Sequence, residues 1–229
     1  MTDVHCHVTG GDPSVREFLI GRDFIGVHPW ESFGGLGGLE GLESWLRDKL
    51  TNPNLPNSEA PNLFPGVGEI GLDRLREREI SPLMRDLFET QLRLALEFGR
   101  PVVLHGAKCW GQVVRTIQTF QTSQTFQTSQ TFLFHGFSRS DGLIPDIVAL
   151  GGYISVGPAV LNDHAVNYRE LVKKIPLDRL LLETDRTPEN AAECPSVTEV
   201  AAETAKLRGL SLSELETLTD ENAERFRCR

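Results

Sequence analysis

The sequence predicts an α/β fold in which parallel strands alternate with helices and close into a (β/α) barrel. Short apolar runs alternate along the chain with longer segments of helical character, which is typical of repeated βα units. The chain has 229 residues, close to the roughly 200 to 250 residues of a single α/β barrel. Its hydrophobic fraction of 39% is sufficient for a sizeable core. We therefore expect one domain spanning residues 1–229.

Composition and charge exclude several classes of protein. Lys and Arg number 23 against 32 Asp and Glu, a net charge of −9 that argues against a basic nucleic-acid scaffold. No window reaches the roughly 20 consecutive apolar residues that span a bilayer, and the first ten residues carry no signal-peptide pattern. We expect no membrane association, a cytoplasmic location and, for the oligomeric state that the sequence leaves open, a monomer. The four cysteines show no C-x-x-C spacing and are predicted to be free thiols.

Seven apolar runs are predicted to be the barrel strands. In chain order they are Asp3–Val8, Asp23–His28, Phe64–Ile70, Pro101–His105, Thr131–Phe137, Gly152–Val156 and Arg179–Thr184. The clearest helix is Leu83–Phe98, whose apolar residues recur every three to four positions before a Gly-Arg-Pro stop. Residues Pro195–Phe226 are predicted to form two helices divided at 208–211, with Ser211 or Ser213 capping the second.

Two segments are predicted to be exposed loops or insertions. Thr51–Asn62 is rich in proline and asparagine, which disfavour helices and strand ladders. Thr119–Phe132 contains the hexapeptide TFQTSQ twice and the start of a third copy. A period of six residues matches neither a helix nor a strand, so we interpret this segment as a tolerated surface expansion.

The first predicted strand carries a candidate metal-binding pair. His5 and His7 are separated by one residue, so on a strand both side chains point to the same face. Two imidazoles one pleat apart can chelate a single metal ion. A short H-x-H pattern is weak evidence when it stands alone.

Further candidate ligands follow the ends of other predicted strands. They are Glu69, His105, His135 and Asp185. In a parallel barrel the carboxyl ends of the strands form the active-site face, so these side chains and the histidine pair are expected to meet there. Each also has a structural interpretation, as a hydrogen-bonded core histidine, a helix N-cap or a loop charge. For the metal site to be absent, such an interpretation would have to hold at all six positions, the histidine pair included.

The ordered motifs of the chain resemble one known family. DVHCH, GVHPW, GEIGLD, VVLH, FHGFS, GGYIS, LLLETD and ENAERF follow in order between residues 3 and 226. This series is similar to the TatD-like metal-dependent deoxyribonucleases of the amidohydrolase superfamily. The resemblance implies a TIM-type barrel with a two-metal centre. It implies that His5, His7 and Asp185 bind one ion, that His105 and His135 bind the other, and that Glu69 bridges them.

The candidate residues fit hydrolysis of a phosphodiester. Two divalent ions can activate water and neutralise charge on the attacked phosphate, so no nucleophilic side chain is required. Asp185 is suited to take the proton of the attacking water and return it to the leaving group. Mixed imidazole and carboxylate ligands accept zinc and manganese, among other metals, whereas a requirement for magnesium or manganese is implied by the resemblance. The expected partner is DNA or another phosphodiester, and the expected activity is that of an exonuclease on single strands or frayed ends.

The chain departs from the family at two places. Only about twenty residues separate His7 from His28, where the family has an extra βα unit, and residues Asp12–Arg22 hold one plausible helix. We therefore expect a shortened barrel that is seven-stranded or incompletely closed. The family also has an arginine two residues after the ligand histidine, at the position of Ala107 in this chain.

Four residues are candidate substrate contacts at the rim: His28, Lys108, Arg139 and Arg186. The three basic residues are predicted to replace the absent arginine as phosphate ligands, with solvated loop charges as the alternative interpretation. His28, in a His-Pro turn, is predicted to donate to a phosphate or to orient its loop. Two other functions remain open: a metal-dependent hydrolase of a small ester, lactone or amide, and a non-catalytic metal-binding relative.

Overall fold

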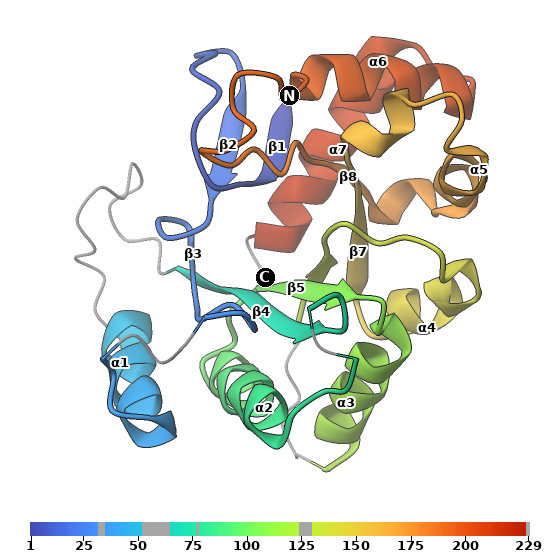
Figure 1. Cartoon of the computed structure of the whole chain (residues 1–229). Coiled ribbons are helices and arrows are strands. Elements are labelled where there is room, and N and C mark those ends of the chain that lie inside the picture. The colour runs from blue at the N-terminus through green and yellow to red at the C-terminus, as the bar shows by residue number, and fades with distance from the viewer. Residues whose placement is uncertain (32–34, 52–64, 77, 124–129, 228–229) are drawn as a thin grey trace.

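Parallel strands form the framework of the computed structural model, which describes all residues except 32–34, 52–64, 77, 124–129 and 228–229 (Figure 1). Within the described residues, β1 (Thr2–Cys6) pairs with β2 (Arg16–Leu19) in a two-stranded sheet. A six-stranded sheet follows in chain order: β3 (Phe24–Ile25), β4 (Gly66–Asp73), β5 (Val102–Ala107), β6 (Phe132–Phe134), β7 (Gly152–Val156) and β8 (Leu180–Leu182). Every pairing is parallel, as the alternating pattern predicts.

The two sheets meet at both of their edges. The backbone N–H of Asp185 donates to the carbonyl of His5 over 3.0 Å, and the N–H of His7 donates to the carbonyl of Arg186 over 2.8 Å. An isolated parallel bridge between Ile20 and Phe24 links the end of β2 to β3. Because these contacts join β8 to β1 and β2 to β3, the strands follow one another around a barrel wall, which confirms the predicted fold class.

The expectation of seven strands is wrong for the described chain, because Arg16–Leu19 is a strand where a helix was expected. Phe18 supplies the reason, since it is buried in a cluster with Val4 and Phe24 while its neighbours in β2 are more exposed. A short strand with one buried face satisfies this pattern better than a helix. The shortening removes the connecting helices instead: residues 7–15 join β1 to β2 and residues 20–23 join β2 to β3, with no helix in either connection.

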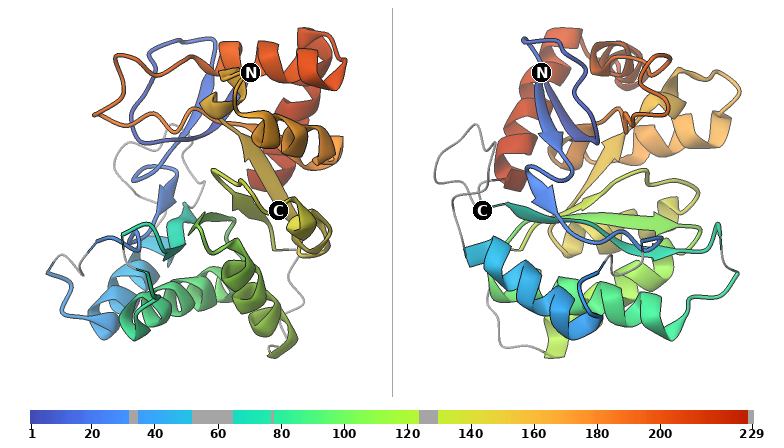
Figure 2. Two further views of the ribbon diagram at one scale, coloured as in Figure 1. Left: turned by 45° about the vertical axis from the view of Figure 1, so that its right-hand side comes forward. Right: turned by 60° about the vertical axis from the view of Figure 1, so that its left-hand side comes forward.

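Helices surround the six-stranded sheet. They are α1 (Leu39–Thr51), α2 (Pro82–Glu97), α3 (Trp110–Ser123), α4 (Ile144–Ala149), α5 (Val166–Lys174), α6 (Val197–Arg208) and α7 (Leu212–Arg227). Figure 1 shows α2 and α3 beside β4 and β5, with α1 next to α2. The views of Figure 2 show α7 running beside β1 and β8. None of the helices in the described residues combines the length and apolar character needed to cross a membrane.

The helix boundaries follow local capping chemistry. Ser81 caps α2 by accepting from the N–H of Met84, close to the start predicted for this helix. Gly209 ends α6 in a left-handed conformation with φ of 67°, and Ser211 accepts from the N–H of Glu214 at the start of α7. The predicted division of the last segment into two helices, with Ser211 as a cap, is confirmed.

The expected insertion at Thr119–Phe132 is partly wrong. Residues 119–123 continue α3, and Phe132 begins β6. Thr119 and Thr122 tolerate the helix because their hydroxyls donate to carbonyls one turn earlier, those of Arg115 and Gln118. Residues 124–129 lie outside the described residues, as does the predicted loop Thr51–Asn62 apart from Thr51, which ends α1.

Side chains alternate between two buried clusters along the central strands, and this alternation decides which face His105 lies on. In β5, Val102 and Leu104 pack in the larger cluster with residues of α2 and α3. Val103 points the other way, into a cluster that includes Tyr153 of β7 and Phe226 of α7. His105 lies two residues beyond Val103, so it continues this second face at the carboxyl end of β5. Cys6, Cys109 and Cys194 are free thiols, as predicted, and Cys228 lies outside the described residues.

Candidate metal centre

All six predicted ligands come together at the carboxyl ends of the strands. His5 lies in β1 and His7 just beyond it; Glu69 lies in β4 and His105 in β5; His135 and Asp185 follow β6 and β8. His5, His135 and Glu69 are buried, whereas the side chain of Asp185 is half exposed. The arrangement is therefore a pocket of imidazoles and carboxylates that is open on the Asp185 side.

The first group of candidate ligand atoms lies around His5 and His7. His5 Nε2 lies 3.5 Å from Asp185 Oδ1 and 3.6 Å from Glu69 Oε2. His7 Nε2 lies 3.7 Å from the same two oxygens. Ligands of a tetrahedral ion with bonds of about 2.0 to 2.2 Å are separated by about 3.3 to 3.6 Å, so these separations are close to ligand spacing. His5, His7 and Glu69 form one group that could hold a metal ion, and His5, His135 and Asp185 form another. Neither ring nitrogen of buried His5 has a hydrogen-bond partner, as expected for an imidazole that binds a metal ion.

A second group gathers on the other oxygen of Glu69. Oε1 lies 2.6 Å from His105 Nδ1, 2.9 Å from His135 Nε2 and 3.7 Å from His28 Nε2. The two carboxylate oxygens thus face two different sets of imidazoles. This geometry suits a bridging carboxylate.

Three buried carboxylates support the ligands, and sequence reasoning assigned none of them a role. Asp73 Oδ2 lies 2.7 Å from His105 Nε2, and Glu183 Oε2 lies 3.4 Å from His135 Nδ1. Asp3 accepts from the N–H of His5 and from both the N–H and the hydroxyl of Thr184. Such partners orient metal ligands and fix the tautomer of an imidazole. An acidic residue inside or at the end of a buried apolar run is the sequence signal that could have identified them.

Electrostatics keeps Glu69 ionised. Burial alone would raise the pKa of Glu69, but the charge of His135, close contacts from His105 and His135, and the nearby His28 outweigh it and hold the pKa well below its usual value. His135 shows the reciprocal effect: burial would lower its pKa, yet Glu69 and Glu183 raise it well above the ordinary value. Glu69 is therefore an anionic carboxylate at the centre of the histidine cluster, as a metal ligand must be.

Asp185 is also held in its anionic form. Burial would raise its pKa, but the nearby His5 imidazole, 3.5 Å away, and the charge of His135 lower it below the usual value. The pKa of His7 is lowered by burial and by the neighbouring His5. A carboxylate anion beside a neutral imidazole is the protonation state that metal binding requires.

Backbone strain also marks this rim. The non-glycine residues with positive φ in the described chain are Lys108 (57°), Arg139 (58°) and Asp185 (50°). Each follows the carboxyl end of a barrel strand, or lies close beyond it. Left-handed backbone at non-glycine residues costs free energy and tends to persist at functional positions.

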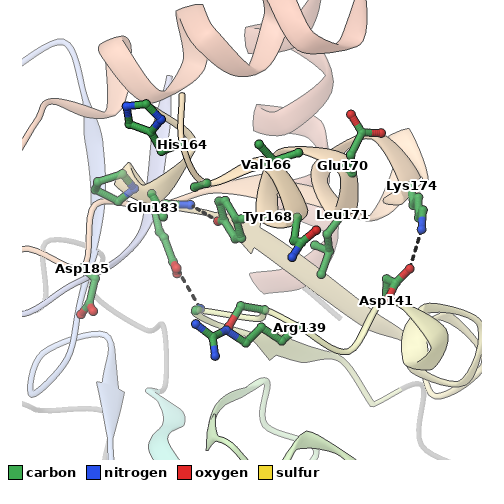
Figure 3. Close-up of a pocket in the computed structure, with 17 residues that line it drawn as sticks. Arg139, Asp141, His164, Val166, Tyr168, Glu170, Leu171, Lys174, Glu183 and Asp185 are labelled. Atoms are coloured by element: carbon green, nitrogen blue, oxygen red, sulfur yellow. Dashed lines mark hydrogen bonds and ion pairs between the residues drawn. The ribbon is translucent and has the colours of Figure 1, made fainter. Parts of the chain in front are cut away.

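The predicted substrate contacts do not all reach the centre. His28 Nε2 lies 3.4 Å from His105 Nδ1 and lines a cavity of about 580 Å³ next to the ligands. Arg139 lines a second cavity, of about 990 Å³, that shares Asp185 with the first (Figure 3). Lys108 is exposed and lines neither cavity. Arg186 is mostly buried, its Nη1 lies 4.0 Å from Glu17 Oε1, and it lines neither cavity.

A separate group of Asp3, Cys6 and Glu17 offers three ligand types within reach of one another but does not fit a metal ion. The oxygens of Asp3 already accept hydrogen bonds from Thr184, and those of Glu17 accept from Thr9 and Gly10. Burial raises the pKa of the Cys6 thiol, so it does not provide the thiolate that binds metals.

Comparison with known proteins agrees with this geometry. The family model described as TatD related DNase matches residues 21–227. The chain belongs to this family. The crystal structure of YjjV, a TatD homologue from Escherichia coli K12, superposes with a TM-score of 0.72 at 23% identity and covers 99% of this chain and 97% of that one. At this identity the likeness shows the fold alone.

Several curated proteins are similar to this chain in sequence. An uncharacterized metal-dependent hydrolase, YabD of Bacillus subtilis, is 29% identical over 70% of this chain and 64% of its own length. One from Haemophilus influenzae is 36% identical over 63% of this chain and 50% of its own length. The chain thus spans between half and two thirds of these relatives. The 3'-5' ssDNA/RNA exonuclease TatD of Pantoea vagans is 27% identical over 72% of this chain and 66% of its own length.

Proposed function

We propose that this TatD-family protein is a metal-dependent phosphodiesterase that removes nucleotides from the ends of single-stranded DNA. The observation that carries the proposal is the position of the Glu69 carboxylate between two pairs of histidines. Its Oε2 faces His5 and His7, and its Oε1 faces His105 and His135. The Pantoea relative named as a 3'-5' ssDNA/RNA exonuclease supports the choice of substrate.

In this proposal His5, His7, Asp185 and Glu69 Oε2 hold one divalent ion, and Glu69 Oε1, His105 and His135 hold a second. We expect magnesium, manganese or zinc. When bound, such ions supply Lewis-acid activation of water and of the phosphate. The unpartnered nitrogens of buried His5 support the fit of a cation.

The protein's own residues perform the proton transfers and hold the substrate. Asp185, kept anionic by His5 and His135, takes a proton from the attacking water and returns it to the leaving oxygen. His28 lies beside Glu69 and His105 in the cavity wall, where it can donate to a phosphate oxygen. Asp73 and Glu183 hold the His105 and His135 rings in place.

The cavity of about 990 Å³ is the proposed path of the rest of the strand. It begins at Asp185 and runs past Arg139 to Lys174, which pairs with Asp141 (Figure 3). Arg139 is therefore the strongest of the three predicted phosphate contacts, because its cavity also reaches Asp185. Lys108 and Arg186 stay predictions that gain no support from either cavity. The cytoplasmic location, the single domain and the monomeric state also stay predictions.

The decisive experiment is hydrolysis of end-labelled single-stranded DNA by metal-stripped protein after addition of magnesium, manganese or zinc. We expect stepwise loss of nucleotides that depends on metal and disappears in Asp185→Asn. Asp86→Asn, at an exposed position of α2, is the matched control and should retain activity. Metal binding without cleavage of DNA would instead favour the small-ester hydrolase, and no turnover of any ester would favour the non-catalytic relative.

The basic residues are tested by charge reversal. Arg139→Glu is expected to raise KM for DNA severalfold with a smaller change in kcat, whereas Arg115→Glu, exposed on α3, should change neither. Arg186→Glu tests the arginine that lies near Glu17. An unchanged KM in that variant would remove Arg186 from the set of phosphate contacts.

A further inference from the structure

The smaller cavity beside the metal centre has an unusual distribution of charge. Four acidic residues line it: Glu31, Glu69, Asp185 and Glu189. Among the described residues in its wall, Arg76 is the only arginine or lysine. A phosphate-bearing ligand that enters this cavity therefore meets one positively charged side chain besides the histidines and any bound metal.

Trp30 forms part of the same wall and is held in position by the metal centre. Its backbone N–H donates to His28 Nδ1 over 3.2 Å, and its indole lies close enough to Asp73, the residue that also pairs with His105 Nε2, to help lower the pKa of that carboxyl. Its ring stands nearly perpendicular to His28 and His105, at centroid distances of 4.7 and 5.8 Å. Trp30 nevertheless remains 42% exposed. A fixed indole with a large exposed surface in a cavity is well suited to contact another aromatic ring.

Arg76 lies over Trp30. Its guanidinium carbon is 4.0 Å from the centroid of the indole, a cation–π contact. The side chain is exposed, and no carboxylate in the described part of the chain forms an ion pair with it. The stacked pair thus combines two flat surfaces with a positive charge that is available to a ligand.

We propose that Trp30 and Arg76 form the contact for the terminal nucleotide of the substrate strand. The base stacks on the Trp30–Arg76 pair, and the guanidinium of Arg76 pairs with a phosphate oxygen. Aromatic rings and arginine planes bind bases of any sequence in single-strand sites, because every base has a π face. This inference rests on the proposed nuclease function and specifies its substrate as a nucleotide, in preference to phosphodiesters without a base.

The test compares an intact single-stranded oligonucleotide with oligonucleotides that have an abasic residue at the 3' or the 5' terminus. Binding to metal-stripped protein is measured by fluorescence anisotropy, and cleavage is measured after addition of manganese. We expect the wild type to bind the intact strand about tenfold more tightly than the strand that is abasic at the attacked end. Trp30→Ala should abolish this difference. Trp30→Phe, which keeps a ring and loses the N–H, should retain most of it.

Two further variants separate the base contact from the phosphate contact. Arg76→Gln is expected to weaken binding of intact and abasic strands by similar factors, because both strands keep their phosphates. Arg85→Gln, exposed on α2, and Trp45→Phe, half-buried on α1, are the matched controls and should behave as the wild type. Thermal unfolding of each variant identifies any loss that comes from misfolding, in which case Trp30→Phe decides the test.

The two proposals fail in distinguishable ways. Equal binding and cleavage of intact and abasic strands by the wild type would overturn the Trp30–Arg76 contact while leaving the nuclease in place. The same preference for the intact strand in Trp30→Ala as in the wild type would also overturn it. A wild type that neither binds nor cleaves any of the strands would overturn both proposals.

Discussion

Asp73 accepts a hydrogen bond from His105 over 2.7 Å and thereby sets the direction of a ring whose other nitrogen faces Glu69. Asp73 is fully buried, so its carboxylate is a fixed acceptor for the Nε2 proton. With Nε2 committed to Asp73, Nδ1 of His105 is the nitrogen that would bind a metal ion, in exchange for the proton that it shares with Glu69. The ligand properties of this histidine are therefore set by a residue that lies outside the ligand cluster.

Removal of this acceptor is expected to weaken metal binding. Asp73→Asn should lower the affinity for manganese or zinc by about 10- to 100-fold, because an amide no longer fixes the tautomer of His105. Isothermal titration of metal-stripped protein measures the effect, with Asp86→Asn as the control. Unchanged affinity would mean that His105 is not a ligand or that it binds through either nitrogen.

Metal binding is expected to stabilise the fold. At a metal concentration about 100 times Kd the free energy of unfolding should rise by about 2.7 kcal/mol. For a chain of this length that corresponds to an increase in Tm of roughly 5 to 10 °C. Thermal unfolding with manganese and with a chelator measures the shift. His5→Ala should lose it, and His164→Ala, at an exposed position, should keep it; a shift that survives in His5→Ala would place the ion elsewhere.

The gathering of the candidate ligands at one rim was predictable because it follows from the strand topology. Parallel strands place their carboxyl ends at one rim, so Glu69 and His105 could be located from the ends of two apolar runs without knowledge of side-chain packing. Family resemblance then assigned them to two ions. The geometry around Glu69 agrees with that assignment, because its two oxygens face different imidazoles.

Features that depend on packing or on chain direction were not predictable in the same way. The strand Arg16–Leu19 has one buried aromatic residue, Phe18, and four residues carry too little periodicity to distinguish a strand from a helix. Arg186 follows Asp185 in sequence, but its side chain lies near Glu17. The direction of a loop side chain depends on contacts between distant segments, and its neighbours in sequence do not encode it.

A β-carbon at Gly71 is expected to disturb the metal centre. Gly71 in β4 has φ of 152°, and a β-carbon would lie 2.0 Å from the carbonyl oxygen of His105. Gly71→Ala should therefore lower the free energy of unfolding by about 2 kcal/mol or more and displace His105. Urea unfolding and metal titration measure the two effects. Gly142→Ala, where the added atom has open space, is the control, and equal stabilities of the two variants would contradict the close approach of β4 and β5.

The ion pair between Arg169 of α5 and Glu203 of α6, with Nη2 and Oε1 2.6 Å apart, is expected to make stability depend on pH. The hydrogen bond from Arg169 lowers the pKa of Glu203, and desolvation raises it by less. The pKa therefore stays below its ordinary value of 4.5. Because the folded-state pKa is depressed, the stabilisation is present above the unfolded-state pKa and is lost as the pH falls through the folded-state pKa.

Glu203→Gln should therefore be less stable than the wild type by about 0.5 to 1 kcal/mol at pH 7, the range for an ion pair near the surface. The difference should shrink as the pH falls below about 4.5, because the wild-type carboxylate is then protonated too. Thermal unfolding of both proteins between pH 7 and pH 3 measures this. Glu216→Gln, on α7, is the comparison variant. A stability difference for Glu203→Gln that stays constant across the whole pH range would show that packing of the side chain, and not its charge, joins α5 to α6.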